Sequence, residues 1–211
     1  MKINLFSKLQ IKVTRLMPLL LVSLSLLLQA CTAPGVKDEP GLIAFLMEES
    51  FLVGHIYLMK ADGSTPYPLN TGLKEDGCPV WSADGSKLLF ISDNDPTEVY
   101  SANQNLYIVD INNGNLTRIS NNELIYSTAS FSPDGKQIVF SATSDSTKYH
   151  FQNIYLMNID GSDIVKITDA PPIFFYPVWS PIENYILVIA NYIDVDSSLY
   201  NILLLNPDGE V

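Results

Sequence analysis

The sequence predicts an all-β protein, a β-propeller of four-stranded antiparallel blades. The first observation is a hairpin sequence that recurs along the chain. It reads CPVWSADGSKLLFIS at 78–92, TASFSPDGKQIVFSA at 128–142 and YPVWSPIENYILVIA at 176–190. The second is its period, because the aromatic residue of the hairpin returns after 50 and then 48 residues, at Trp81, Phe131 and Trp179. A repeat of this length with short strands is typical of a propeller blade.

The residues of each hairpin explain its turn and its strands. Pro133 fixes the backbone angle that the second position of a type I turn needs, and Gly135 can adopt the left-handed conformation that closes it. The runs 87–91 and 137–140 are apolar at nearly every position rather than at alternate positions. Such strands are covered on both faces, which a radial stack of sheets provides.

The period divides the chain into four blades, at about 41–70, 77–120, 127–168 and 175–211. The first blade lacks the aromatic-bearing first strand, and the last one stops at Asp208-Gly209, where the other blades turn into a fourth strand. We therefore expect an incomplete arc of about three and a half blades. Because exposed strand edges favour aggregation, we also expect this chain to be a fragment of a larger propeller.

The WSADG and FSPDG hairpins are followed by NLYIVD at 105–110 and by NIYLMNIDG at 153–161. This pattern resembles the WD40-like (PD40) repeats of the TolB family, and the resemblance covers roughly residues 42–209. It implies blades like those of that family's C-terminal six-bladed propeller. It does not imply a role in the Tol-Pal machinery, because members of that family also carry an N-terminal α/β domain for which this chain has no room.

Residues 1–30 are predicted to be a signal peptide, with basic residues up to Arg15 and an apolar segment at 16–28. The sequence Leu-Gln-Ala-Cys that ends at Cys31 resembles a bacterial lipoprotein box, which implies cleavage before Cys31 and lipid on its sulfur. Residues 31–40 then form a tether, and the protein faces the periplasm from the outer membrane where a cell has two membranes. A plain secretory signal and a retained membrane helix remain alternatives.

The charge and the cysteine count narrow the class of partner. The net charge is −11, and since the first thirty residues hold four basic residues and no acidic one, the remainder carries about −15. A surface of this sign repels phosphate backbones, so no nucleic-acid partner is expected. With Cys31 lipidated, Cys78 has no partner for a disulfide, and we expect it to be a small buried apolar residue.

The motifs of common enzymes are absent from the sequence, so we expect no catalysis and no cofactor. There is no G-x-S-x-G, no P-loop and no G-x-G-x-x-G. His55, expected at the surface or at an edge, lies about a hundred residues from His150, which excludes a multi-histidine metal site. Asp84 and Asp134 directly precede Gly in the hairpins and are expected to form turns rather than to act as catalytic carboxylates.

The loops between the second and third strands of each blade are the predicted ligand face, at 48–54, 93–104, 143–152 and 191–199. They combine acidic and aromatic residues, which protein and glycan partners commonly contact. The alternatives are a solvated acidic rim, or a Ca²⁺ site for which the paired carboxylates are too few. The candidate residues are Glu48, Phe51, Asp93, Asp95, Tyr100, Tyr149, His150, Phe151, Tyr192, Asp194 and Asp196.

The sequence therefore favours a lipid-anchored binding or scaffold protein of the bacterial envelope that recognises a protein, a peptide or a glycan. The alternative is the propeller portion of a prolyl-oligopeptidase-like serine peptidase whose hydrolase domain lies outside this chain, since those enzymes use similar repeats. The two hypotheses differ in the presence of a G-x-S-x-G motif beyond Val211.

Overall fold

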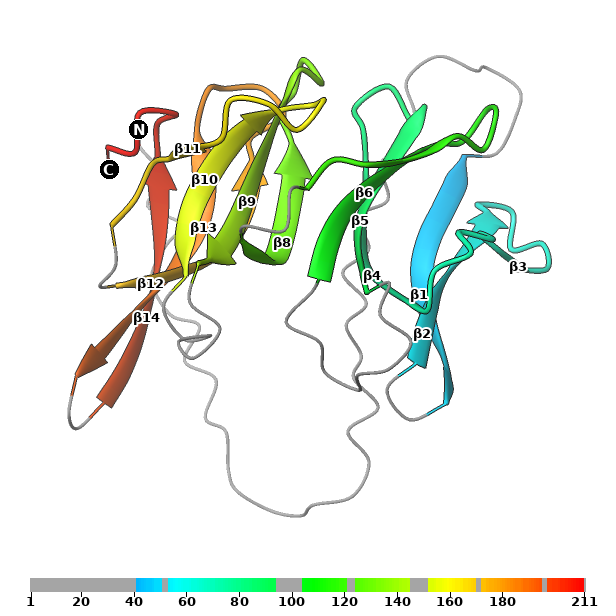
Figure 1. Cartoon of the computed structure of the whole chain (residues 1–211), viewed down its shortest axis with the longest axis horizontal. Helices are drawn as coiled ribbons and strands as arrows, with labels where there is room; N and C mark the ends of the chain where they lie inside the picture. The colour runs from blue at the N-terminus through cyan, green and yellow to red at the C-terminus, as the bar shows by residue number, and fades with distance from the viewer. Residues whose placement is uncertain are drawn as a thin grey trace, which may run out of the picture.

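The computed structural model describes residues 41–50, 53–93, 104–120, 124–144, 152–169, 172–194 and 197–210. These residues form fourteen strands and no helix. The strands make four antiparallel sheets that stand side by side as blades (Figure 1). The predicted all-β class and the four-stranded blade are thereby confirmed.

Each sheet follows the chain from its first strand to its last. The first sheet is β1 (Leu42–Ser50), β2 (Val53–Lys60) and β3 (Tyr67–Pro68), and the second is β4 (Glu75–Trp81), β5 (Lys87–Asp93), β6 (Gln104–Asp110) and β7 (Leu116–Arg118). The third is β8 (Ile125–Phe131), β9 (Gln137–Thr143), β10 (Asn153–Asn158) and β11 (Val165–Lys166), and the fourth is β12 (Ile173–Trp179), β13 (Ile186–Asp194) and β14 (Ser197–Leu205). We call these sheets blades 1 to 4.

The aromatic residue of the repeat has the same place in three blades. Trp81, Phe131 and Trp179 are the last residues of β4, β8 and β12. They pair with the equivalent residues of the next strand, Leu88, Ile138 and Ile186. This common setting is what the period of the sequence predicts.

The Ser-Ala/Pro-Asp-Gly turns form as their residues predict. Gly85 has φ of 69° and donates its N–H to Ser82 O at 2.9 Å. The carboxylate of Asp84 accepts hydrogen bonds from Ser82 Oγ at 2.6 Å and from Ser86 N at 3.0 Å. These bonds lower the pKa of Asp84 to about 2, because they stabilise the ionised carboxylate. The prediction that this aspartate forms a turn is confirmed.

The inner strands of blades 2, 3 and 4 each contain a β-bulge, which the sequence does not predict. In blade 2 the register with β5 shifts between Gly77 and Val80, and Cys78 inside the bulge has φ of 50°. Tyr176 occupies the same position in blade 4 with φ of 52°. The strand β4 begins at Glu75, ahead of the bulge. The prediction that Cys78 is buried was wrong, because the bulge turns its side chain outward and leaves it exposed.

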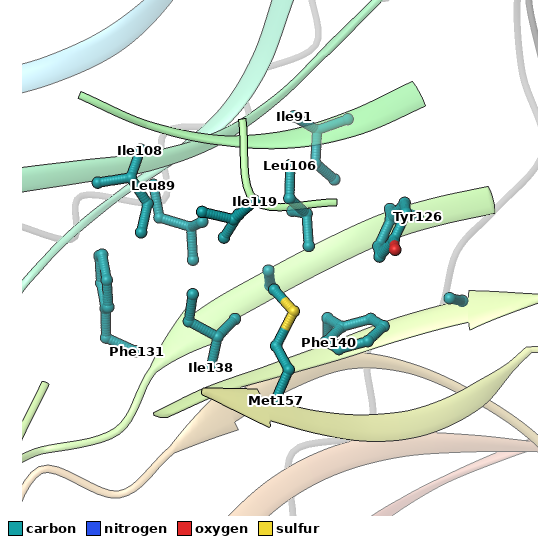
Figure 2. Close-up of a cluster of buried hydrophobic side chains, with 12 residues drawn as sticks. Leu89, Ile91, Leu106, Ile108, Ile119, Tyr126, Phe131, Ile138, Phe140 and Met157 are labelled. Carbon is teal, nitrogen blue, oxygen red and sulfur yellow. The ribbon is translucent and has the colours of Figure 1, made fainter. Parts of the chain in front are cut away.

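Apolar side chains fill the spaces between neighbouring blades. We call the face of a blade that meets the next blade its leading face, and the opposite face its trailing face. Between blades 2 and 3, Leu89 and Leu106 on a leading face meet Phe140 and Met157 on a trailing face (Figure 2). Similar clusters lie between blades 1 and 2 and between blades 3 and 4. Each fully buried large apolar side chain contributes about 1.5–3 kcal/mol to stability.

A glycine in the turn after the third strand brings two blades into close contact. A Cβ on Gly161 of blade 3 would lie 2.1 Å from the carbonyl oxygen of Ile119 in blade 2. A Cβ on Gly209 of blade 4 would lie 1.8 Å from the carbonyl oxygen of Ile167 in blade 3. The backbone of each blade therefore approaches its neighbour where only glycine fits.

The four blades form an open arc. In the described part of the chain, blades 1 and 4 do not contact each other (Figure 1). Blade 1 begins with β1, the equivalent of β5, so no inner strand equivalent to β4 is described there. In the same way, β14 is the equivalent of β6 and β10, and its outer edge has no fourth strand among the described residues. The predicted incomplete arc is confirmed.

We expect Gly161→Ala to destabilise the protein more than Gly63→Ala does. Both glycines have a left-handed backbone, with φ of 86° and 80°. An L-residue in that conformation costs about 1–2 kcal/mol at either site. Only Gly161 adds a clash with the neighbouring blade, since a Cβ on Gly63 would have nothing within 4 Å.

The clash should lower the free energy of unfolding of Gly161→Ala by about 1–3 kcal/mol more than the backbone conformation alone does. The measurement is urea denaturation of both variants and of the unmodified chain. Equal losses at the two positions would contradict the close contact between blades 2 and 3.

Candidate functional site

The candidate site lies at one end of the blades, which we call the loop end. Here the second strand of each blade passes to the third, and the chain also enters each inner strand. The Asp-Gly turns lie at the opposite end, which we call the turn end. The loop end is the face on which the sequence places ligand-binding residues.

Most of the predicted site residues lie outside the described residues. This group contains Cys31, Phe51, Asp95, Tyr100, Tyr149, His150, Phe151 and Asp196. Four others lie within strands although their side chains are not described, namely Glu48 in β1, Asp93 in β5, and Tyr192 and Asp194 in β13. The predicted long loops at 48–54 and 191–199 were wrong, because β1–β2 and β13–β14 extend as hairpins up to residues 51–52 and 195–196.

A buried carboxylate is the centre of the described part of the loop end. Asp76 on β4 has a fully buried side chain. Its oxygens accept a hydrogen bond from Thr71 Oγ1, at 3.1 and 3.2 Å. The Nδ1 atom of His55 on β2 lies 3.5 Å from Asp76 Oδ2. Asp76 on blade 2 is therefore joined to blade 1 through His55 and to the segment between the two blades through Thr71.

His55 is more constrained than the sequence indicates. We expected it at the surface or at an edge before the strand, whereas it lies within β2 and its side chain is only 27% exposed. The strand β2 packs directly against β4. This contact brings the imidazole of His55 to the carboxylate of Asp76, and with a proton on the imidazole the two form an ion pair.

The residue at the position of Asp76 differs in the other blades. The register that pairs Asp76 with Ser92 pairs Tyr126 with Ala142 in blade 3 and Phe174 with Ala190 in blade 4. The aromatic residues are buried in the cores between blades. An acid at a position where the other blades bury an aromatic ring is a signal present in the sequence, and aligning the repeats position by position would have found it.

A small cavity adjoins this carboxylate. It has a volume of about 40 Å³ and is lined by Glu75, Asp76, Gly77, Ile91, Ser92 and Gln104. This space suits a water molecule that bridges polar groups and is too small for an organic ligand. The cavity is therefore part of the support of the loop end rather than a binding pocket in itself.

Burial raises the pKa of the Asp76 carboxyl, because it disfavours the charged form. Hydrogen bonds from Thr71 and His55 partly oppose this shift, since they stabilise the carboxylate. A buried acid with several hydrogen-bond donors is typical both of functional sites and of structural networks. Here all the donors come from within the fold.

A second polar cluster stabilises the loop end of blade 2. Asn105 Oδ1 at the start of β6 accepts hydrogen bonds from Arg118 Nη2 and from Ser120 Oγ, both at 2.7 Å. Blade 3 repeats this arrangement, since Thr168 Oγ1 lies 3.3 Å from Asn153 Oδ1. These asparagines hold the outer strand of a blade to its third strand.

The described residues contain no candidate metal site. No group of three or more His, Cys, Asp or Glu side chains that could hold a metal ion occurs among them. Within the same ranges, no helix has the length and apolar character needed to cross a bilayer. What the described part of the loop end does offer is a set of polar side chains joined by hydrogen bonds.

The radial stack of antiparallel sheets defines the class of the protein as a β-propeller. A family model described as "Dipeptidyl peptidase IV (DPP IV) N-terminal region" matches residues 82–175. Among curated proteins, no sequence matches the chain.

Solved structures define the type of propeller more closely. A TolB protein from Agrobacterium tumefaciens is similar over 81% of this chain and 59% of its own, with 24% identity and a TM-score of 0.68. TolB from Acinetobacter baumannii is similar over 81% of this chain and 39% of its own, with 20% identity and a TM-score of 0.62. This chain has a TolB-like propeller fold and spans less than two thirds of either protein.

A third solved structure with a similar fold is also a propeller domain. The β-propeller domain of the Trilobed protease from Pyrococcus furiosus, described as having an open velcro topology, is similar over 78% of this chain and 51% of its own. Its identity is 11% and its TM-score is 0.54. These likenesses establish the fold and leave the function to the site.

We expect the stability difference between the unmodified chain and Asp76→Asn to depend on pH. Because the folded state raises the pKa of Asp76, it holds that proton more tightly than the unfolded chain does. The unmodified chain should therefore lose stability relative to the variant as pH rises from about 4 through the raised pKa, and the difference should then stay constant. Urea denaturation at a series of pH values from 3 to 8 gives the difference directly.

Asp84→Asn is the matched control for this experiment. The pKa of Asp84 is lowered to about 2, so its stabilising effect should be complete above about pH 4 and should disappear as pH falls through about 2. The two variants should thus show slopes of opposite sign. A difference for Asp76→Asn that does not change with pH would contradict the raised pKa.

Proposed function

We propose that this chain is a lipid-anchored protein of the bacterial envelope that binds a protein, a peptide or a glycan through its loop end and catalyses no reaction. The observation that carries this proposal is a TolB-like propeller whose loop end is built from interlocked polar side chains. The strands beneath are apolar on both faces and packed between neighbouring blades, which supports a single geometry for those polar side chains. A preorganised surface loses little entropy when it binds a partner.

The polar side chains differ in their availability to a partner. Asp76 and Asn105 are buried and already have hydrogen-bond partners within the fold. Gln104 and Arg118 are exposed beside them. The buried pair supports the surface, and the exposed pair can exchange hydrogen bonds with a ligand. The combination suits reversible binding.

The lipid anchor is proposed on the sequence alone. Cys31 follows an apolar segment of thirteen residues and precedes a short tether. A lipidated cysteine carries several acyl chains, and more than one chain is needed for stable attachment to a membrane. In a cell with two membranes we place the protein on the outer membrane, facing the periplasm.

Cys31→Ser should abolish lipid attachment, because the acyl chains are proposed to be carried by the Cys31 sulfur. The measurement is metabolic labelling with an alkyne fatty acid, followed by detection of the labelled protein in the membrane fraction. Cys78→Ser is the matched control, since Cys78 is the other cysteine of the chain and should have no effect. Labelling of Cys31→Ser at the level of the unmodified chain would contradict the anchor.

Photo-crosslinking in cells tests binding at the loop end. A photoreactive residue replaces Gln104 at the loop end or Lys136 at the turn end, and both positions are exposed. We expect discrete adducts from position 104 and none from position 136, because the proposed partner contacts one end of the blades. Equal yields at the two ends, or adducts at neither, would contradict the proposal.

A second candidate function rests on the match of residues 82–175 to the N-terminal region of dipeptidyl peptidase IV. In this alternative the propeller is part of a serine peptidase. A fluorophosphonate probe distinguishes the two functions when it is applied to the protein as the producing cell makes it. Labelling of an active serine supports the peptidase, and no labelling together with adducts at the loop end supports the binding protein.

A further inference from the structure

His55 and Asp76 both differ from the residues at the equivalent positions of the other blades. The repeat distances of 50 and 48 residues give His55 the position of Asn105 and Asn153, which form hydrogen bonds within their own blades. Asp76 has a position at which the inner strands of blades 3 and 4 carry a buried aromatic residue. The Nδ1 atom of His55 lies 3.5 Å from Asp76 Oδ2. The two residues that differ from the repeat are therefore in contact with each other.

The contact with Asp76 fixes which ring nitrogen of His55 carries the proton. The side chain of Asp76 is fully buried, and His55 donates a hydrogen bond to its carboxylate. An ionised carboxylate only accepts hydrogen bonds, so the Nδ1 atom that faces it has to be the N–H nitrogen. A neutral imidazole has one N–H, and its second nitrogen is an acceptor. The Nε2 atom of His55 is therefore an acceptor whenever the ring is neutral.

The nitrogen that remains as an acceptor lies on the accessible side of the ring. The His55 side chain is 27% exposed although its Nδ1 atom faces a buried group. The two ring nitrogens are separated by Cε1 and point in different directions, so the contact at Nδ1 leaves Nε2 to face away from Asp76. His55 is also close to the start of β2, which places it at the loop end. The exposed edge of its ring therefore belongs to the same end of the blades as Gln104 at the start of β6.

The surroundings of this nitrogen are negatively charged. A neutral imidazole and an ionised carboxylate together carry one negative charge. The small cavity beside Asp76 adds the acid Glu75 and the amide of Gln104 to the same end of blade 2. Arg118, the exposed arginine of this blade, donates a hydrogen bond to Asn105 Oδ1 on the third strand. With a net charge of −11 on the chain, this end of the blades attracts a cation more readily than an anion.

We propose that His55, positioned by Asp76, accepts a hydrogen bond at Nε2 from a lysine or arginine side chain of a protein partner. This inference rests on the proposed binding at the loop end and names one contact of it. Asp76 itself does not touch the partner. Its carboxylate orients the imidazole and makes the ring a stronger acceptor, as carboxylates do for histidines that bind metal ions. A hydrogen bond from a charged donor is about twice as strong as a neutral one, so this contact contributes both affinity and selection for a basic segment.

Two substitutions of His55 separate the role of Nε2 from that of Nδ1. In His55→Asn, the side-chain amide replaces Nδ1 as the donor to Asp76, and no atom replaces Nε2. Asn also occupies this position in blades 2 and 3, so we expect the variant to fold. In His55→Gln, the longer side chain places an acceptor oxygen near the position of Nε2. If His55 only held the two blades together, His55→Asn would be the milder substitution.

Photo-crosslinking in cells measures the contact with the partner. With the photoreactive residue at position 104, the yield of adducts should fall at least about tenfold in His55→Asn, because one charge-assisted hydrogen bond is lost. The yield should stay within about twofold in His55→Gln. Asp76→Asn should lower the yield less than His55→Asn does, because an amide partly orients the ring without supplying negative charge. Urea denaturation of each variant shows whether it is folded.

Proton–nitrogen NMR spectra of the imidazole rings, recorded on the full chain in a mild detergent, test the orientation and the cation. The signals that disappear in His55→Asn identify the ring. At about pH 8 histidine rings are ordinarily neutral, and His55 should carry its proton on Nδ1. A blocked Gly-Lys-Gly peptide should shift the Nε2 resonance. The same peptide with an acetylated lysine should leave it unchanged, because acetylation removes the charge.

Different results would overturn different parts of the proposal. Equal adduct yields in the unmodified chain and in His55→Asn would overturn the role of His55 and leave binding at the loop end intact. No adduct from the unmodified chain would overturn the proposed binding and this contact together. A proton on Nε2 of His55 would overturn the positioning by Asp76. An adduct whose partner segment has no lysine or arginine, or the same response to both peptides, would mean that a different class of partner binds.

Discussion

The structure depends on the packing of the leading face of one blade against the trailing face of the next. The apolar run of β5 shows this most clearly, because Leu88 and Phe90 face blade 1 while Leu89 and Ile91 face blade 3. A strand between two neighbours must be apolar on both sides, and this is why the runs lack the alternation of a half-exposed sheet. The turn residues, the bulges and the glycine contacts all serve to present these faces at the right separation.

The buried carboxylate lies at the junction between blades 1 and 2, where β2 packs against β4. At that junction the aromatic ring of the trailing face is replaced by Asp76, and His55 reaches it from β2. The cost of burying a carboxylate is offset by hydrogen bonds, and the raised pKa of Asp76 records the part that is not offset. The replacement of an aromatic residue by Asp76 at this junction thus places a carboxylate in a buried environment.

The same packing also determines the surfaces that the arc leaves open. A blade in the middle of the arc hides both of its faces, whereas blade 4 exposes one that is composed like the hidden ones. The loop end, in contrast, is polar and formed by side chains whose hydrogen bonds hold them in place. In the described part of the chain, the leading face of blade 4 is therefore apolar and the loop end is polar, because the first is a surface of the kind that packs between blades and the second carries the ends of the strands.

The sequence alone determined the repeat, the blade composition, the turns and the open arc, because each of these follows from local residue chemistry. Pro133 and Gly135 specify a turn wherever they occur together, and apolar runs such as 87–91 specify a strand covered on both sides. Of the predicted ligand-face loops, 48–54 and 191–199 are largely strand, and most residues of 93–104 and 143–152 lie outside the described ranges.

Only the tertiary structure decided the positions of Cys78, His55 and Asp76. A bulge inside β4 turns Cys78 outward, and no local residue pattern fixes where a strand will shift its register. His55 and Asp76 lie in different blades, so their contact depends on how two sheets pack. The sheets meet through many weak apolar contacts that act together, and a single sequence shows which residues are apolar without showing which of them touch.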